Sequence, residues 1–305
     1  MSAGCGGGQA IPTVSIEVTG DSWSAGPAAP VALTEVAAAA HQGRIWVAGG
    51  LDAEGIISAA VFVYDPDSDR WEEGPALPEP IHHAALVSDG DALWLIGGYA
   101  GGFDAPTAAV RVLEDGATHW VEHFGLPEPR AAGAAAWDGT AIIYGGGVEP
   151  GSVASEVFAQ RDHGWETIGR LSKPREHLAA ASDGAGQTMF LGGRVGGLEG
   201  NLATVDLVES GTVRSIGDLP TARGGVAAFW WPSVGACLVG GESPGGTDAE
   251  VECTTPDGRQ TRLSDLDVPR HGLGAVTLDG TAWTLLGGPA PGLFVSDVVE
   301  TLRLP

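Results

Sequence analysis

The sequence predicts an all-β protein in which six four-stranded units close into a ring, the architecture called a β-propeller. Turn formers are abundant, with 49 Gly and 20 Pro in 305 residues, and such punctuation is typical of many short strands. Pairs of adjacent glycines also recur every 47 or 48 residues, each at the end of an apolar run. One such unit cannot bury its faces alone, whereas six packed radially can. The pairs are Gly49-Gly50, Gly97-Gly98, Gly145-Gly146, Gly192-Gly193, Gly240-Gly241 and Gly287-Gly288.

The first two strands of each unit form a hairpin that ends at the glycine pair. Asp-Gly, as at Asp89-Gly90 and Asp138-Gly139, separates the strands in four units, and both residues tolerate the positive φ of a tight turn. The first strand is dominated by small residues, as in 36–40, 131–136, 178–181 and 225–228. Their propensity favours helix. We nevertheless predict strands, because small side chains fit the crowded axis of a propeller.

The third and fourth strands follow a Gly-rich loop. The third strand is predicted at 61–65 in the first unit and at 250–253 in the fifth. The fourth carries a tryptophan in several units and leads into a Leu-Pro bend such as Leu77-Pro78. The repeat therefore predicts four strands per unit.

The N-terminal strand is predicted to close the ring. The last unit ends with a third strand at 296–302, and no fourth strand follows it before Pro305. Trp23 lies 48 residues before Trp71, at the fourth-strand position, with no first or second strand before it. A strand at 22–25 would complete the sixth unit and remove a free edge. The segment 14–18 has no predicted place.

The repeat resembles the kelch motif. The resemblance rests on Val63-Tyr64-Asp65-Pro66, Trp71, Leu77-Pro78 and Ile96-Gly97-Gly98-Tyr99. It weakens in two later units, where Val213 and about Gln260 stand at the tryptophan position. It implies one six-bladed propeller of the kelch, galactose-oxidase-like kind over 13–305, after a flexible N-terminal tether at 1–12. Kelch propellers include binding modules and enzymes, so the fold leaves function open.

The charge balance excludes some partners. Fifteen basic and 39 acidic residues give a net charge of −24, which repels nucleic acids and anionic membrane surfaces. We predict no cofactor. Copper-radical chemistry like that of galactose oxidase needs a Tyr-Cys cross-link, and Tyr64, Tyr99 and Tyr144 lie in units without cysteine. We also predict no metal site, because the acidic run 65–69 lacks the glycine and later glutamate of a calcium loop.

The three cysteines give indications about the cellular compartment of the protein. Folding the fifth hairpin about Gly245 places Cys237 opposite Cys253, which predicts a disulfide, with two buried thiols as the alternative. Ser2-Ala3-Gly4-Cys5 resembles a lipoprotein cleavage motif, and a glycine tether follows Cys5. The resemblance implies lipidation of Cys5 and export to the bacterial cell envelope or periplasm. An ordinary N-terminus, and hence a cytoplasmic protein, is the alternative.

Four arginines open the first strands of units three to six, namely Arg130, Arg175, Arg223 and Arg270. The kelch resemblance implies that ligands bind at this loop face, around the axis. Two such charges about 10 Å apart repel by about 1.7 kcal/mol at a dielectric near 20, so something must neutralise them. An anionic ligand held by the guanidinium groups is one interpretation. Pairing with acidic residues of the same loops, among them Glu79, Glu128, Glu176, Asp218 and Asp265, is the other.

One position after these arginines a second row contains potential acids and bases. It reads Glu35, His82, Ala131, Glu176, Gly224 and His271, with His83 and His177 beside it. Strand alternation predicts that one of the two neighbouring rows lines the channel mouth. Carboxylate and imidazole groups there are able to act as general acid and base, as in the sialic-acid epimerases with this fold. Solvated rim histidines are the alternative.

These features favour a binding or interaction module. The predicted ligand is a protein, peptide or glycan with acidic groups, bound by the arginines together with His82 and Glu35, and the chain is predicted to be monomeric. The alternative is a sugar epimerase or mutarotase that uses Glu176, His177 or His271. Membrane contact is expected only through a lipid on Cys5.

Overall fold

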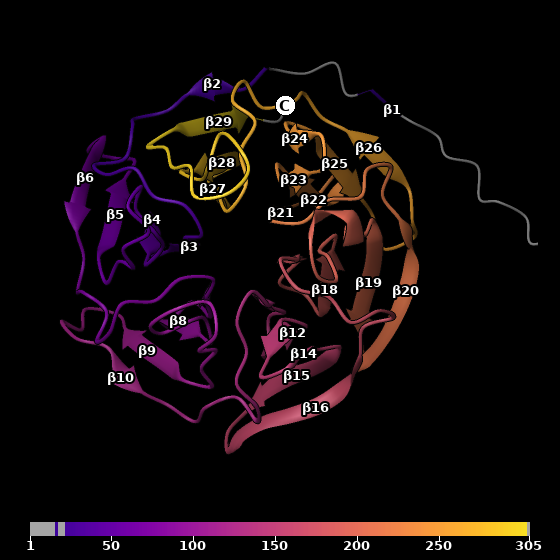
Figure 1. The fold of residues 1–305 in the computed structure, drawn as a ribbon, viewed down its shortest axis with the longest axis horizontal. Coiled ribbons are helices and arrows are strands. Elements are labelled where there is room, and N and C mark those ends of the chain that lie inside the picture. Colours follow the sequence, from indigo (N-terminus) through magenta and orange to yellow (C-terminus); the bar gives the residue numbers. More distant parts are fainter. Residues whose placement is uncertain (1–15, 18–21, 304–305) are drawn as a thin grey trace, which may run out of the picture.

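Six antiparallel sheets surround a central axis like the blades of a propeller (Figure 1). The computed structural model describes residues 16–17 and 22–303. Each blade has four strands, ordered from the axis outward as the chain runs, with the outermost strand of the sixth blade taken from the N-terminus. The predicted fold class is confirmed. Among the described residues, no helix has the length and apolar character needed to span a membrane.

The strand bounds follow the predicted repeat. Blade 1 is β3 (Ala37–His41), β4 (Arg44–Ala48), β5 (Val61–Asp65) and β6 (Arg70–Glu73); blade 2 is β7 (Ala85–Ser88), β8 (Ala92–Ile96), β9 (Val110–Glu114) and β10 (Val121–Glu122); blade 3 is β11 (Ala134–Trp137), β12 (Ile142–Gly145), β15 (Glu156–Arg161) and β16 (Gly164–Arg170). Blade 4 is β17 (Ala179–Ser182), β18 (Gln187–Leu191), β19 (Thr204–Glu209) and β20 (Thr212–Asp218); blade 5 is β21 (Ala227–Trp231), β22 (Gly235–Val239), β25 (Val251–Thr254) and β26 (Gln260–Arg262); blade 6 is β27 (Gly274–Leu278), β28 (Thr281–Leu285), β29 (Val299–Arg303) and β2 (Ser24–Ala25).

Short elements decorate the loops between second and third strands. They are the hairpins β13 (Val148–Glu149) with β14 (Ser152–Val153) and β23 (Glu242–Ser243) with β24 (Gly246–Thr247), and the 3-10 turn η1 (Leu198–Gly200). These loops lie on the same face as the bends that open each first strand, because isolated bridges join the two, as between His82 and Tyr99. We call this face the loop face.

The glycine pairs join consecutive blades. The second glycine of each pair donates its N–H to a carbonyl at the start of the next blade, as from Gly98 to Arg130 at 2.8 Å. A Cβ on Gly97 would lie 2.4 Å from that same carbonyl oxygen, so only glycine permits the approach. The equivalent pair in blade 3 is Gly146-Gly147, one residue later than predicted. In blade 6 the equivalent N–H is that of Gly287, after Leu286 at φ 57°.

The tryptophans of the outer strands join consecutive blades at the periphery. The indole N–H of Trp120 donates to the Pro75 carbonyl at 2.8 Å, and that of Trp71 donates to the Pro27 carbonyl at 3.1 Å. Gln260 takes over this role in blade 5, because its side-chain amide donates to the Asp218 carbonyl at 2.5 Å. The tryptophan of the motif therefore packs its apolar ring between blades and donates a hydrogen bond to the preceding blade.

The ring closes between the two ends of the chain. Ser24 and Ala25 of β2 pair antiparallel with Thr301 and Glu300 of β29, as predicted. The segment without a predicted place supplies β1 (Ile16–Glu17), which pairs in parallel with β26 as a fifth strand of blade 5. Sequence reasoning missed it because a two-residue parallel strand leaves no pattern. The predicted tether at 1–12, with Cys5, lies outside the described residues.

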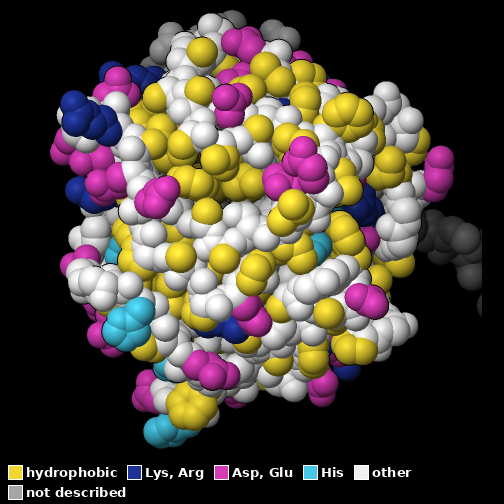
Figure 2. Space-filling view, turned by 60° about the vertical axis from the view of Figure 1, so that its left-hand side comes forward, with side chains coloured by type: hydrophobic (Ala, Val, Ile, Leu, Met, Phe, Trp, Pro, Cys, Tyr) yellow, Lys and Arg dark blue, Asp and Glu magenta, His cyan; other side chains and the backbone are white. Residues whose placement is uncertain are grey.

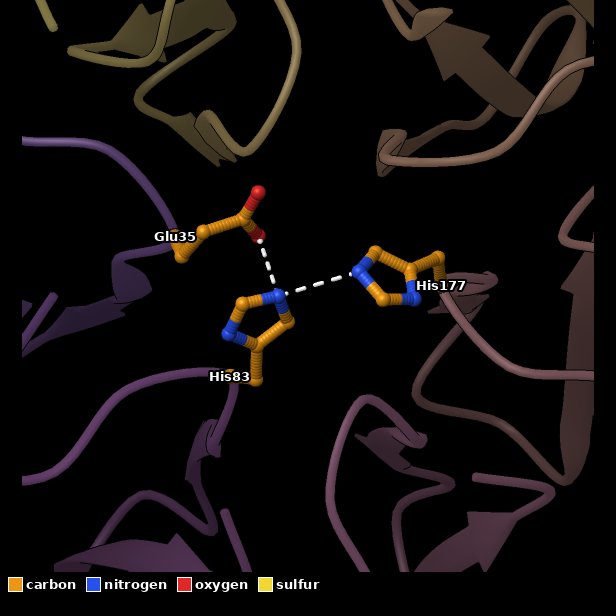
Figure 3. Close-up of side chains that lie close together, drawn as sticks. All are labelled: Glu35, His83 and His177. Carbon is orange, nitrogen blue, oxygen red and sulfur yellow. Dashed lines mark hydrogen bonds and ion pairs between the residues drawn. The ribbon is translucent and has the colours of Figure 1, made fainter. Parts of the chain in front are cut away.

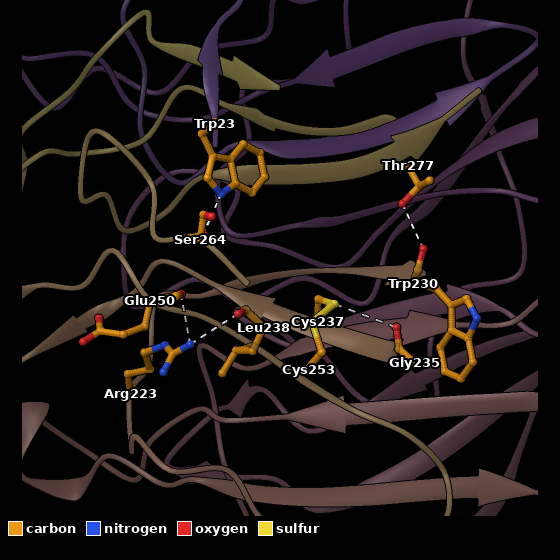
Figure 4. Close-up of a disulfide and its surroundings, with 10 residues drawn as sticks. All are labelled: Trp23, Arg223, Trp230, Gly235, Cys237, Leu238, Glu250, Cys253, Ser264 and Thr277. Carbon is orange, nitrogen blue, oxygen red and sulfur yellow. Dashed lines mark hydrogen bonds between the residues drawn. A yellow bond between two sulfur atoms is a disulfide. The ribbon is translucent and has the colours of Figure 1, made fainter. Parts of the chain in front are cut away.

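The disulfide forms as predicted. Cys237 on β22 lies directly opposite Cys253 on β25, and their sulfur atoms are bonded (Figure 4). Both residues are fully buried in the cluster that joins blades 5 and 6, which includes Phe229 and Trp23. The bridge therefore ties two strands within a core that also holds the N-terminal closure.

Candidate functional site

The four arginines of the loop face are structural. The side chains of Arg130, Arg175, Arg223 and Arg270 are 0–1% exposed. Arg175 pairs with Asp206 at 2.8 Å, and Arg223 pairs with Glu252 at 2.7 Å and donates to backbone carbonyls (Figure 4). The groups predicted to hold an anionic ligand are thus enclosed and neutralised within their blades.

The acidic partners occupy one repeated position on the third strand. Asp206, Glu252 and Glu300 lie on the third strands of blades 4, 5 and 6. In each blade the acidic residue pairs with a residue of the second strand, the one three positions before the glycine whose N–H bonds to the next blade. Blade 3 has Phe158 at this position, and Arg130 lies over its ring while pairing with Glu149 at 2.7 Å. Internal pairing was an alternative at the sequence level. Its partners come from strands and from the β13 loop, not from the bends that were considered.

A ring of six residues with positive φ surrounds the axis at the loop face. They are Glu35, His83, Ala132, His177, Gly225 and Gly272, with φ from 52° to 65°. Four successive N–H groups from His83 to Gly225 each donate to the preceding ring carbonyl, Gly272 donates to Gly225, and Val36 donates to Gly272 at 3.4 Å. This conformation suits glycine and costs other residues of order 1 kcal/mol or more. We call these six residues the axial ring.

Three side chains of the axial ring converge on the axis (Figure 3). Nε2 of His83 lies 3.1 Å from Oε2 of Glu35 and 3.0 Å from Nε2 of His177. A Cβ on Gly272 would approach the Glu35 carboxyl to 2.7 Å, so this glycine leaves room for the carboxyl group. Glu35 therefore belongs to the inner row with His83 and His177. From the sequence, Glu35 was aligned with His82, and this alignment was wrong by one residue. The residue equivalent to His82 is Thr34, because both form an isolated bridge to the loop after the second strand.

A charged network lies beside these three groups. The Glu176 carboxylate contacts Nδ1 of His177, and Nε of Arg194 donates to Oε1 of Glu176 at 3.2 Å. Arg194 also donates to Glu242 at 2.6 Å, and the Asn201 amide donates to the Glu242 carbonyl at 2.7 Å. Arg194 and Glu242 were not selected from the sequence, because each follows a glycine pair and was read only as part of a connecting loop.

His82 and His271 lie at the edge of the cluster. Nδ1 of His82 is 2.6 Å from Nδ1 of His83, and the His82 ring stacks on Tyr99. Nε2 of His82 is buried and has no hydrogen-bond partner among the described residues. Nδ1 of His271 lies 3.1 Å from the Gly288 carbonyl, and its Nε2 lies 3.7 Å from Glu35. The structure thus gathers five of the predicted residues, Glu35, His82, Glu176, His177 and His271, into one cluster.

Burial governs protonation in this cluster. Desolvation and the neighbouring His83 lower the pKa of His82 to about 4, and desolvation and Arg194 lower that of His83 to about 3. Desolvation also holds the pKa of His177 well below its usual value. It raises the pKa of Glu35, against the opposing effect of His271, Arg194 and His82. The imidazoles are therefore neutral at pH 7 and have lone pairs available.

The axial cavity is small and is lined by the ring. Its volume is about 80 Å³, and the axial ring residues and their successors line it. Pockets for drug-sized molecules are usually about 300 Å³ or larger. One or two waters or a single ion fit this space, given about 30 Å³ per water. The cavity itself therefore has room for a small charged species.

Apolar side chains are exposed on the loops around this cavity. Of the eight large hydrophobic side chains exposed in the described part of the chain, five lie between a second and a third strand. These five, which we call the apolar collar, are Ile56, Phe103, Val195, Leu293 and Phe294. Phe103 packs against the rings of His82 and His83. Figure 2 shows another aspect of the surface, where hydrophobic groups lie between scattered acidic ones.

Comparison with known proteins supports the fold and leaves the activity open. The family model for the kelch motif matches residues 32–78, which span the first blade. The solved structure titled "Structure of YjhT" is similar over 92% of this chain and 97% of that one, with a TM-score of 0.78 and 13% identity. No curated protein matches the chain. The predicted kelch resemblance is confirmed, and the likeness to YjhT extends to the fold alone.

Proposed function

We propose that this propeller is a protein-binding module whose loop face receives an apolar, positively charged segment of a partner. The observation that carries the proposal is the apolar collar. Five of eight exposed large hydrophobic side chains lie on loops of this one face. Exposed apolar groups gathered on one face of a protein are typical of interaction surfaces.

The expected partner is positively charged, because the arginines are buried and the rest of the chain is strongly acidic. Since Arg130, Arg175, Arg223 and Arg270 are 0–1% exposed and paired, they are not available to a ligand. The proposed ligand therefore differs from the acidic one expected from the sequence. A chain of net charge −24 attracts basic partners and repels acidic ones, which affects mainly the association rate.

The epimerase alternative receives less support. It requires an acid and a base on opposite sides of a sugar. Glu176 and His177 instead contact each other, and the cavity between the axial ring side chains is about 80 Å³. We therefore do not adopt it.

Peptide display tests the proposal. A library of random 12-residue peptides is selected on the full chain, and the affinities of enriched peptides are measured. Peptides rich in Phe, Leu, Lys and Arg should be enriched. Replacing Leu293 and Phe294 together by serine should weaken their binding by about a hundredfold or more, because burial of each such side chain contributes about 1.5–3 kcal/mol.

Phe124→Ser is the matched control. Phe124 is 55% exposed, against 58% for Phe294, but it follows the outer strand β10 and does not belong to a loop between a second and a third strand. The control should bind as the unmodified chain does. Enrichment of acidic peptides, or equal weakening by both changes, would contradict the proposal.

A further inference from the structure

We propose that Glu35, His83 and His177 form a binding site for one divalent transition-metal ion, such as zinc, at the centre of the propeller. Three blades contribute one ligand each. Nε2 of His83, Nε2 of His177 and a carboxylate oxygen of Glu35 lie within 4.8 Å of one another (Figure 3). Two imidazoles with one carboxylate are a common donor set for zinc and for non-haem iron.

The spacing of the donor atoms fits a single ion. The distance is 3.0 Å between the two Nε2 atoms and 3.1 Å from Nε2 of His83 to Oε2 of Glu35. Around a tetrahedral zinc with bonds of about 2.0–2.1 Å, neighbouring ligand atoms lie about 3.3 Å apart. Small side-chain movements would therefore admit an ion. The remaining coordination position opens into the axial cavity of about 80 Å³, which has room for a water.

The groups behind the ligands orient the lone pairs. The Glu176 carboxylate contacts Nδ1 of His177, so the proton of that neutral ring belongs on Nδ1 and the Nε2 lone pair points to the axis. Nδ1 of His83 lies against Nδ1 of His82, which can accept a hydrogen bond from the Nδ1–H group of His83. A carboxylate or other acceptor behind each ligating histidine is the usual arrangement in metal sites.

The local charge also favours a cation. Three carboxylates, those of Glu35, Glu176 and Glu242, surround one guanidinium, that of Arg194, with ion-pair distances of 3.2 and 2.6 Å to the latter two. These four groups together carry a formal charge of minus two, which a divalent ion balances. Charge balance of this kind matters because the groups are largely enclosed, where charges are weakly screened.

Backbone strain gives an independent indication. Glu35, His83 and His177 have φ of 54°, 54° and 53°, where glycine would be unstrained, and Gly225 and Gly272 occupy the same position in other blades. Strained residues with reactive side chains are concentrated at functional sites. Of the four residues in this ring that are not glycine, three carry the side chains that converge, and the fourth is Ala132.

The test is metal binding by the full chain, freed of metal by a chelator and carrying no histidine tag. Zinc is titrated against a chromophoric chelator, and cobalt is titrated while its visible absorption is recorded. We expect one equivalent of zinc, a cobalt spectrum of low coordination number, and no binding of magnesium at the same concentration, because Mg²⁺ prefers oxygen ligands.

Glycine variants make the test specific. His83→Gly and His177→Gly should fold, because glycine favours their φ, and each should lose zinc affinity by more than a hundredfold. Glu176→Gln should lose about tenfold to a hundredfold, as for other groups behind metal ligands. Ala132→Gly is the matched control, since Ala132 has φ 52° in the same ring and offers no ligand, and it should bind zinc unchanged.

Two results would overturn the inference. One is the absence of zinc binding, or zinc binding that disappears when the exposed His119 and His163 are replaced, which would place the ion at the surface. The other is one equivalent bound equally by the two glycine variants, which would indicate that the cluster is only a hydrogen-bonded network. The peptide-binding proposal fails separately, because Leu293→Ser should leave zinc affinity unchanged.

Discussion

The buried arginines and the axial ring both lie at the loop face, two residues apart in sequence, yet their polar side chains differ in how they are paired. Arg270 donates to the carbonyls of Leu286 and Val298, to Thr284 and to Glu300. His83 and His177, in contrast, bring two ring nitrogens to 3.0 Å, where at most one hydrogen lies between them.

This difference separates stability from function. A buried charge paired with a carboxylate holds its blade together, and removing one partner leaves the other without compensation. An incompletely satisfied cluster in strained backbone lowers stability and is retained for another purpose. The comparison predicts opposite effects of substitution in the two regions.

The largest effect is expected for Arg175→Met. Asp206, which is 0% exposed, would lose its ion-pair partner, and breaking a buried pair in this way costs about 3–5 kcal/mol. Urea unfolding at pH 7 measures the loss. The double change Arg175→Met with Asp206→Leu should recover most of it, since no charge then remains buried. If the single and double variants were equally destabilised, the pair would not be the structural unit inferred here.

The next effect concerns the pH dependence of the metal-free chain. The pKa values of His82 and His83, about 4 and about 3, lie below the unfolded value near 6.5. The unfolded chain therefore binds more protons, and stability, complete above about pH 6.5, falls as the pH drops towards 4. Each excess proton contributes a slope of about 1.4 kcal/mol per pH unit. Urea unfolding between pH 7 and 5 should show this slope, and His83→Gly should reduce it.

A smaller effect of opposite sign is expected for His177→Gly in the presence of a chelator. Relief of the strained φ of 53° and of the crowding against Glu176 should offset the lost contacts. Stability should therefore stay the same or rise by up to about 1 kcal/mol. A loss as large as that for Arg175→Met would remove the distinction between the two regions.

An effect of similar, small size is expected at the periphery, for Trp120→Phe. The ring remains buried, but the donor to the Pro75 carbonyl at 2.8 Å is lost. A hydrogen bond of this kind contributes about 0.5–1.5 kcal/mol. Thermal or urea unfolding measures the change, and Trp94→Phe is a comparison, because its indole bonds within its own blade, to Asp89. A loss for Trp94→Phe as great as for Trp120→Phe would show that the contact between blades is not special.

The repeat alone was sufficient to predict the blades and their closure. The glycine spacing and the Asp-Gly turns are local requirements of backbone conformation, so they remain visible in the sequence. The same holds for the pairing of Cys237 with Cys253, which follows from register about one turn. The two-residue strand β1 was missed because its parallel pairing to β26 has no local signature.

The sequence by itself determined which residue types reach the loop face, namely the arginines and the Glu and His rows. Only the tertiary structure decided their roles, because burial and partners depend on residues that are far apart in the sequence. Arg175 meets Asp206 across its own blade, whereas Glu35, His83 and His177 meet across three blades. In the first blade Thr34 forms the bridge to the loop, and the next residue, Glu35, belongs to the axial ring. The backbone geometry assigns each residue to its row.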